Sequence, residues 1–140
     1  MPAASKSVEV NATPERLMSV ITDFTRYPRF LPEMEEATLI RREGDVWTVK
    51  FAVRIVRKLE YTLRLEKQSD VKLRWTLVEG AFKANNGGWD LVALDGGTRT
   101  RATYTIDLDI GMFVPGSVLK TVLEHNLPST LAAFKAQAEG

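Results

Sequence analysis

Alternation of apolar and polar residues dominates the middle of the chain. In Leu59–Glu66, leucine and tyrosine alternate with charged residues and threonine, and Lys72–Leu77 and Thr103–Asp109 have the same period of two. Successive side chains of a β-strand point to opposite faces, so this period predicts strands with one face covered and the other in water.

The segment Val46–Val56 departs from this pattern. Its nominally outer face carries the apolar residues Val46, Ala52 and Val56. Either this strand is buried on both faces, or it belongs to a contact surface.

Turn signals recur about every ten residues and divide the region into an antiparallel meander. The signals are Glu43-Gly44-Asp45, Gln68-Ser69-Asp70, Glu79-Gly80, Asn85-Asn86-Gly87-Gly88 and Asp95-Gly96-Gly97. The predicted strands are Ala37–Arg42, Val46–Val56, Leu59–Lys67, Lys72–Val78, Gly88–Leu94 and Thr98–Ile110.

Before this region the sequence predicts one further strand and two short helices. Ser7–Asn11 reads as the strand, and Thr13-Pro14-Glu15 follows it as a helix start, with Thr13 at the N-cap and Pro14 at the first helical position. Thr25–Pro32 holds two prolines and large apolar residues, which predicts a second short helix or an ordered turn.

The C-terminal segment predicts one long amphipathic helix. Apolar residues recur there at intervals of four, four, four, three and four: Leu119, Leu123, Leu127, Leu131, Phe134 and Ala138. We expect the helix to begin near Pro115–Ser117, to be roughly 35 Å long at about 1.5 Å per residue, and to kink at Pro128. At about 100° per residue, Asn126 and Thr130 face inward with the leucines, and His125 and Ser129 face outward.

These elements predict a single domain of the α+β class over residues 1–140. Its fold is a helix-grip fold, in which a curved antiparallel sheet of six to seven strands wraps around the long C-terminal α-helix, with two short helices after the first strand. A single helix touches only part of a curled sheet, so a gap between helix and sheet follows. Either side chains fill that gap or a ligand occupies it.

Composition removes several classes of function. Lysine and arginine number 19 against 18 acidic residues, a net charge of +1, so we expect no nucleic-acid partner. The chain has no cysteine, which excludes disulfides and thiolate chemistry and favours the cytoplasm. Met1–Val10 contains Lys6 and Glu9 and no long apolar run, so we expect neither secretion nor stable membrane insertion.

Residues that carry catalytic chemistry are scarce. His125 is the only histidine and faces outward, and no serine lies in a Gly-x-Ser-x-Gly motif. We therefore assign no catalytic residue, no metal and no cofactor. Glu79 continues the inward phase of Trp75 and Leu77, but it precedes Gly80 at the strand end, where we expect it to reach water.

The order of elements resembles a known group of proteins along essentially the whole chain. The stretches that carry the resemblance are Val10–Glu15, Tyr27–Pro32, Trp75–Gly80, Trp89 with Asp95–Thr98, and Leu131–Lys135. They resemble the START-like superfamily, also called the polyketide cyclase/dehydrase and lipid transport group. Within it, Tyr27–Pro32 is most similar to the coenzyme Q-binding proteins and bacterial cyclase-like relatives. The resemblance implies a hydrophobic cavity whose mouth is formed by the loop before the C-terminal helix.

We expect the ligand-binding residues to lie on the inner sheet face, the inward face of the last helix and the two apolar segments that flank the sheet. They are Tyr27, Phe30, Leu31, Phe51, Val53, Leu63, Trp75, Leu77, Trp89, Tyr104, Ile106, Phe113, Leu123, Asn126 and Thr130. Core packing is the other explanation of the same pattern.

Three functions are compatible with this pattern. The first is binding or transport of a hydrophobic small molecule, such as a lipid, a quinone or a polyketide-like compound, without catalysis. The second is a polyketide cyclase or aromatase, in which Tyr104, Asn126 and Thr130 steer water and protons. The third is a protein-interaction domain, as a homodimer or as a partner of a toxin-like or ribosomal system, that uses Val46, Ala52 and Val56. For the first function we expect a monomer or a weak homodimer.

Overall fold

Seven antiparallel strands form one sheet in the order β1-β7-β6-β5-β4-β3-β2. The structure is a computed structural model that describes residues 3–55, 57–109, 120, 124 and 126–140. Its elements are β1 (Ala3–Val10), α1 (Pro14–Ile21), η1 (Phe24–Arg29), β2 (Met34–Glu43), β3 (Val46–Ile55), β4 (Arg57–Ser69), β5 (Lys72–Gly80), β6 (Ala84–Leu94), η2 (Asp95–Gly97), β7 (Arg99–Asp109) and α3 (Leu127–Glu139).

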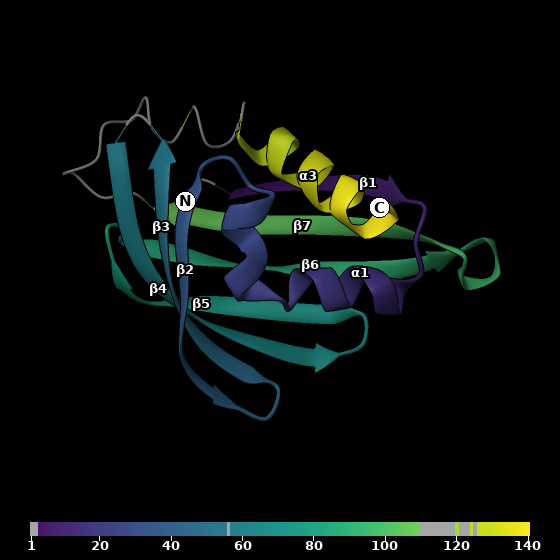
Figure 1. Cartoon of the computed structure of the whole chain (residues 1–140), viewed down its shortest axis with the longest axis horizontal. Helices are drawn as coiled ribbons and strands as arrows, with labels where there is room; N and C mark the ends of the chain where they lie inside the picture. Colours follow the sequence, from purple (N-terminus) through teal and green to yellow (C-terminus); the bar gives the residue numbers. More distant parts are fainter. Residues whose placement is uncertain (1–2, 56, 110–119, 121–123, 125) are drawn as a thin grey trace.

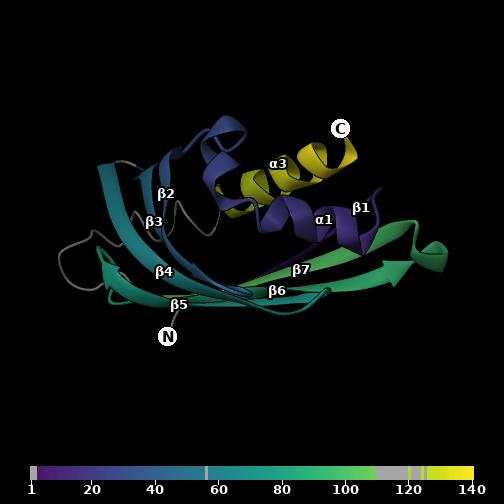
Figure 2. The ribbon, with the colours of Figure 1, turned by 60° about the horizontal axis from the view of Figure 1, so that its bottom comes forward.

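The sheet curves, and α1, η1 and α3 lie on one side of it. Figure 1 shows α1, η1 and α3 against one face, and Figure 2 shows that this face is the concave one. Buried apolar residues of β3 to β7 form one core cluster with those of α1, η1 and α3. The predicted α+β helix-grip architecture, with a sheet of six to seven strands, is therefore confirmed.

The two short N-terminal helices are also confirmed, whereas the first strand is Ala3–Val10 and not the predicted Ser7–Asn11. The Thr13 side chain accepts a hydrogen bond of 3.1 Å from the Arg16 amide, and Pro14 occupies the first turn of α1. The proline-rich segment forms the 3₁₀ helix η1, in which Phe24 and Tyr27 are buried.

One predicted turn is wrong. Asn85-Asn86-Gly87-Gly88 lies inside β6, and the chain turns instead at residues 81–83. A Cβ on Gly87 would lie 2.2 Å from the Thr105 carbonyl oxygen and 2.7 Å from the Trp75 ring. The glycine is needed for this close approach and not for a turn.

Strands β5 and β6 pair only from Lys72–Asp90 to Trp75–Gly87 and then diverge. Beyond that point β5 continues along β4 and β6 continues along β7. The Trp75 Nε1–H group spans the divergence by donating a hydrogen bond of 3.1 Å to Asn85 Oδ1.

A β-bulge at Val78 makes the side chains that follow it in β5 point to the opposite face of the sheet from the one that the alternation predicts. Leu77 pairs with Leu63 and Glu79 pairs with Thr62, which leaves Val78 as the extra residue, 55% exposed. Glu79 therefore shares the outer face with Thr62 and is exposed, as expected.

The outer face of β3 is covered at its centre. Ala52 is only 1% exposed, because Lys50 and Arg54 on either side of it form ion pairs with glutamates of the neighbouring strands at 3.0 and 3.1 Å. Val46 is partly buried, and Val56 lies outside the described residues. Burial on both faces is thus the explanation that holds at Ala52.

The C-terminal helix is confirmed where it is described, because residues 120, 124 and 126 are helical as well as α3. α3 begins at Leu127, whereas the predicted start near Pro115–Ser117 lies outside the described residues. Pro128 occupies the first turn of α3, so the predicted kink falls at the boundary of the described part. The apolar stripe is confirmed where it is described, because its members are buried: Leu127, Leu131, Phe134 and Ala138.

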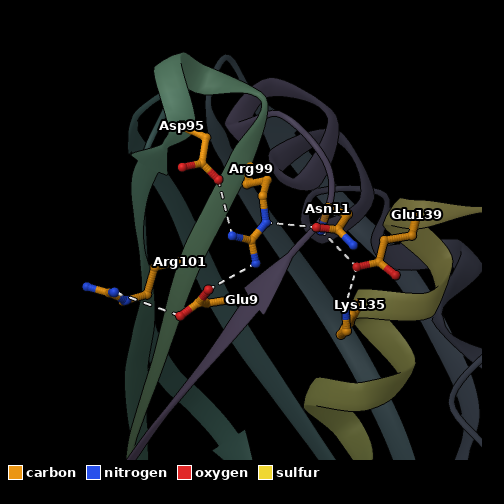
Figure 3. Close-up of polar contacts among 7 residues, drawn as sticks. All are labelled: Glu9, Asn11, Asp95, Arg99, Arg101, Lys135 and Glu139. Carbon is orange, nitrogen blue, oxygen red and sulfur yellow. Dashed lines mark hydrogen bonds and ion pairs between the residues drawn. The ribbon is translucent and has the colours of Figure 1, made fainter.

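A polar network fixes the C-terminal end of α3 to the sheet (Figure 3). The backbone N–H group of Asn11 donates a hydrogen bond of 2.8 Å to Glu139 Oε2, and Lys135 forms an ion pair with the same carboxylate. The Arg99 guanidinium donates to Asn11 Oδ1 at 2.8 Å and forms ion pairs with carboxylates of β1 and η2. We call this network the polar clasp; it consists of Glu9, Asn11, Asp95, Arg99, Lys135 and Glu139.

The side chain of Arg16 adds a second attachment at the same end. It donates hydrogen bonds of 3.3 Å to the carbonyl oxygens of Gln137 and Ala138. These carbonyls have no partner within the helix, so the guanidinium completes the end of α3. The helix is thereby attached to α1, β1 and β7.

The polar clasp predicts a pH-dependent contribution to stability. The hydrogen bond from the backbone N–H of Asn11, followed by the one from the Lys135 side chain, lowers the pKa of the Glu139 carboxyl in the folded state. A carboxylate with a lowered folded pKa stabilises the fold above its unfolded pKa, and this contribution is lost as the pH falls through the folded pKa. Glu139→Gln should therefore lower the melting temperature at pH 7, and the difference from the wild type should vanish in acid. Calorimetry across that pH range measures both effects.

Asp45→Asn, which changes an exposed carboxylate in the turn between β2 and β3 outside the polar clasp, is the control. Its melting temperature should follow that of the wild type at every pH. Equal pH profiles for the two variants would contradict the role of the clasp.

The Trp75–Asn85 bond predicts a second effect. Asn85 is 4% exposed, so Asn85→Leu keeps a buried side chain of similar size but leaves the indole N–H of Trp75 without its acceptor. We expect a loss of about 1–3 kcal/mol in the free energy of unfolding, measured by urea denaturation. Asn86→Leu, at the exposed neighbouring position, should change it by less than about 0.5 kcal/mol. Similar losses in both variants would show that the bond is not the cause.

Candidate functional site

A cavity of about 160 Å³ lies between the concave face of the sheet and α3. Its walls come from η1, from the segment that leads into β2, from β3 to β7 and from the N-terminal half of α3. The divergence of β5 and β6 exposes Phe82 and Asn85 to the same space.

Most of the predicted ligand-binding residues line this cavity. They are Tyr27, Leu31, Phe51, Val53, Leu63, Trp75, Trp89, Tyr104, Ile106, Asn126 and Thr130. The structure thus brings together residues that are more than a hundred positions apart in the chain. Their role in binding stays a prediction.

Four predicted residues do not line the described cavity. Phe30 instead packs edge-on against Tyr27 and Phe134, with ring centroids 5.8 and 5.3 Å apart, so it supports the wall from behind. Leu77 is partly buried in the contact between the two hydrophobic clusters of the core. Phe113 and Leu123 lie outside the described residues.

Sequence reasoning missed ten lining residues. They are Glu33, Met34, Tyr61, Leu65, Leu73, Phe82, Asn85, Leu108, Leu127 and Phe134. Six of them follow the same alternation or helical stripe as the predicted residues, so that signal was available. Phe82 and Asn85 had no such signal, because their position depends on where β5 and β6 separate.

Aromatic rings form a continuous series around the cavity. Each ring contacts the next with centroids 5.0–5.9 Å apart. We call this series the aromatic chain; its order is Phe82, Tyr61, Phe51, Tyr27, Phe134, Trp89, Tyr104 and Trp75. Most contacts are edge-to-face, the arrangement that ring quadrupoles favour.

The tyrosine hydroxyls at the cavity are protonated donors. Burial raises the pKa of Tyr27, Tyr61 and Tyr104 well above the ordinary value. The Tyr27 hydroxyl donates to the Ile21 carbonyl oxygen. The hydroxyls of Tyr61 and Tyr104 form no hydrogen bond with another residue of the described part.

α3 and the residue just before it contribute two neutral polar side chains to the wall. Asn126 and Thr130 are four residues apart on the same helix face. The Asn126 Oδ1 atom is buried and accepts no hydrogen bond from any described residue.

The lining residues offer little acid–base chemistry. Glu33 is the one carboxylate among them. Within the ranges that the structure describes, no cluster of three histidine, cysteine or acidic side chains is placed to hold a metal ion. His125 lies outside those ranges. The arrangement is suited to enclosing an apolar molecule and orienting it with a few neutral groups.

Among the described helices, none combines the length and the apolar character needed to cross a bilayer.

Comparisons with known proteins agree with this geometry. A curated relative, the ribosome association toxin RatA of Vibrio cholerae, is 28% identical over 97 residues, which cover 68% of this chain and 67% of that protein. A START superfamily protein from Mycobacterium smegmatis is 23% identical and superposes with a TM-score of 0.85, over 98% of this chain and 97% of that one. The Zhui aromatase/cyclase from Streptomyces sp. R1128 is 20% identical with a TM-score of 0.87, over 99% of this chain and 93% of that one.

These two solved structures share the fold of this chain. The family model described as polyketide cyclase / dehydrase and lipid transport matches residues 10–135, nearly the whole chain. This protein therefore belongs to the polyketide cyclase / dehydrase and lipid transport family.

Proposed function

We propose that the protein binds and carries a hydrophobic small molecule in the cavity between the sheet and α3. The observation that supports this most directly is the cavity itself, because protein interiors are otherwise packed with few voids larger than a water molecule. A fold that keeps such a space gains stability when an apolar ligand fills it.

The energetics of binding follow from the walls. Apolar surface removed from water contributes about 25 cal/mol per Å², and the lining is largely aliphatic and aromatic. The neutral polar groups at Asn85, Asn126 and Thr130 then set the orientation of the ligand. A lipid, a quinone and a polyketide-like compound are the classes that the family and the cavity suggest. The cytoplasmic location and a monomer or weak homodimer stay predictions.

A second candidate is polyketide cyclisation. It is favoured by one observation, which is that Tyr104, Asn126 and Thr130 all line the cavity, where a folded polyketone would meet them. The raised pKa of Tyr104, caused mainly by burial, makes its hydroxyl a donor and not a base at neutral pH. We rank carriage first because forming the enolate of a polyketone requires a base. The described wall offers one carboxylate, Glu33, for this role and no histidine.

Ligand retention tests the carrier function. Native mass spectrometry of protein purified without delipidation should show a bound small molecule, and Leu63→Trp should lose it because the indole fills the cavity. Leu39→Trp, at a residue of β2 that is 44% exposed, should retain it. Ile106→Phe is the second filling variant, with circular dichroism to confirm folding. A wild type that carries nothing, and that does not bind the apolar dye anilinonaphthalene sulfonate, would contradict the proposal.

Turnover separates carriage from cyclisation. Incubation with a poly-β-ketone thioester should give no cyclised, dehydrated product above the rate without protein, as measured by liquid chromatography with mass detection. Product formed by the wild type and lost in Tyr104→Phe and Thr130→Val, with binding retained, would establish the cyclase instead.

A further inference from the structure

The buried oxygen of Asn126 is an acceptor without a donor in the described part of the chain. Two side-chain oxygen atoms there are buried and unpaired, Asp107 Oδ1 and Asn126 Oδ1, and only Asn126 belongs to the cavity wall. Leaving a buried acceptor unpaired destabilises the protein. A hydrogen-bond donor on the ligand would remove that penalty.

The nearby polar groups of the wall leave this acceptor available. The Trp75 indole N–H already donates to Asn85, and the Tyr27 hydroxyl already donates to the Ile21 carbonyl. Thr130 lies one helical turn from Asn126 and lines the same space. The ligand therefore meets a short polar strip on α3.

The remaining wall selects for rings. The eight side chains of the aromatic chain line the cavity, and contacts between aromatic rings add an attraction beyond the burial of area. An alkyl chain gains only the burial term from the same surface.

The size of the cavity points the same way. A volume of about 160 Å³ is close to the roughly 150 Å³ cavity that holds benzene. It lies well below the range of about 300–1,000 Å³ of pockets for drug-sized ligands. Only a short part of a long acyl chain would fit in this volume, and the rest would extend beyond the described walls.

We propose that the ligand is a compact aromatic molecule of one or two rings that carries a hydroxyl group, and that this hydroxyl donates a hydrogen bond to Asn126 Oδ1. This inference rests on the proposed carrier function and narrows its ligand class. Long-chain lipids are then poor ligands.

Four probes test the inference on the wild-type protein: 2-naphthol, 2-methoxynaphthalene, naphthalene and palmitate, titrated while tryptophan fluorescence is followed. The two-ring probes should bind, and 2-naphthol should bind about tenfold more tightly than 2-methoxynaphthalene, which has no donor. Palmitate should bind more weakly than 2-naphthol.

Variants assign the preference to one atom. In Asn126→Leu the preference for 2-naphthol should disappear, while the affinity for naphthalene stays within about twofold. Asn86→Leu, the same change at an exposed residue of β6, should leave the preference intact. Because the probe series is complete with the wild type alone, a variant that fails to fold does not remove the test.

The outcomes separate this inference from the carrier function. Tight binding of palmitate with no binding of 2-naphthol would overturn the aromatic class and leave the carrier function standing. Equal affinities for 2-naphthol and 2-methoxynaphthalene, or a preference that survives Asn126→Leu, would overturn the role of Asn126. If no probe binds and native mass spectrometry shows no ligand, the carrier function itself fails.

Discussion

Burial of one stripe of α3 against the concave face of the sheet is the contact on which the rest of the molecule depends. Leu127, Leu131 and Phe134 are each 7% exposed or less. At about 1.5–3 kcal/mol for each large apolar side chain, their burial contributes roughly 5–9 kcal/mol. That is comparable with the whole net stability of a typical domain, about 5–15 kcal/mol. Without α3, the inner face of the sheet would be a large apolar surface in water.

The same contact also creates the cavity. A straight helix cannot follow a curved sheet along its full length, so close packing at the C-terminal end of α3 leaves space near its N-terminal end. Bulky rings narrow this space without filling it, since each ring of the aromatic chain is already held by its neighbours. The site is thus a consequence of how two regular elements of different curvature meet.

Periodic patterns predicted the parts of the structure that depend on local sequence. The alternation in Leu59–Glu66 identified β4, and the apolar spacing after Leu119 identified α3 where it is described. Asn85–Gly88 was interpreted wrongly because a glycine pair suits both a turn and a close approach between strands. Only the position of the Trp75 ring, set by another strand, distinguishes the two cases. The bulge at Val78 is likewise invisible in the sequence, since one extra residue depends on the register of the partner strand.

The attachments at the end of α3 have a mechanical consequence. The polar clasp and Arg16 hold the last turn, so any rigid-body movement of the helix is a rotation about that fixed end. Asn126 precedes Glu139 by 13 positions, which is about 20 Å at 1.5 Å per residue. A rotation of about 5° then displaces the Asn126 end by roughly 1.7 Å over this length, more than half the length of a hydrogen bond. Small rotations of the helix about its C-terminal turn therefore produce larger displacements at the opposite end, where the cavity lies.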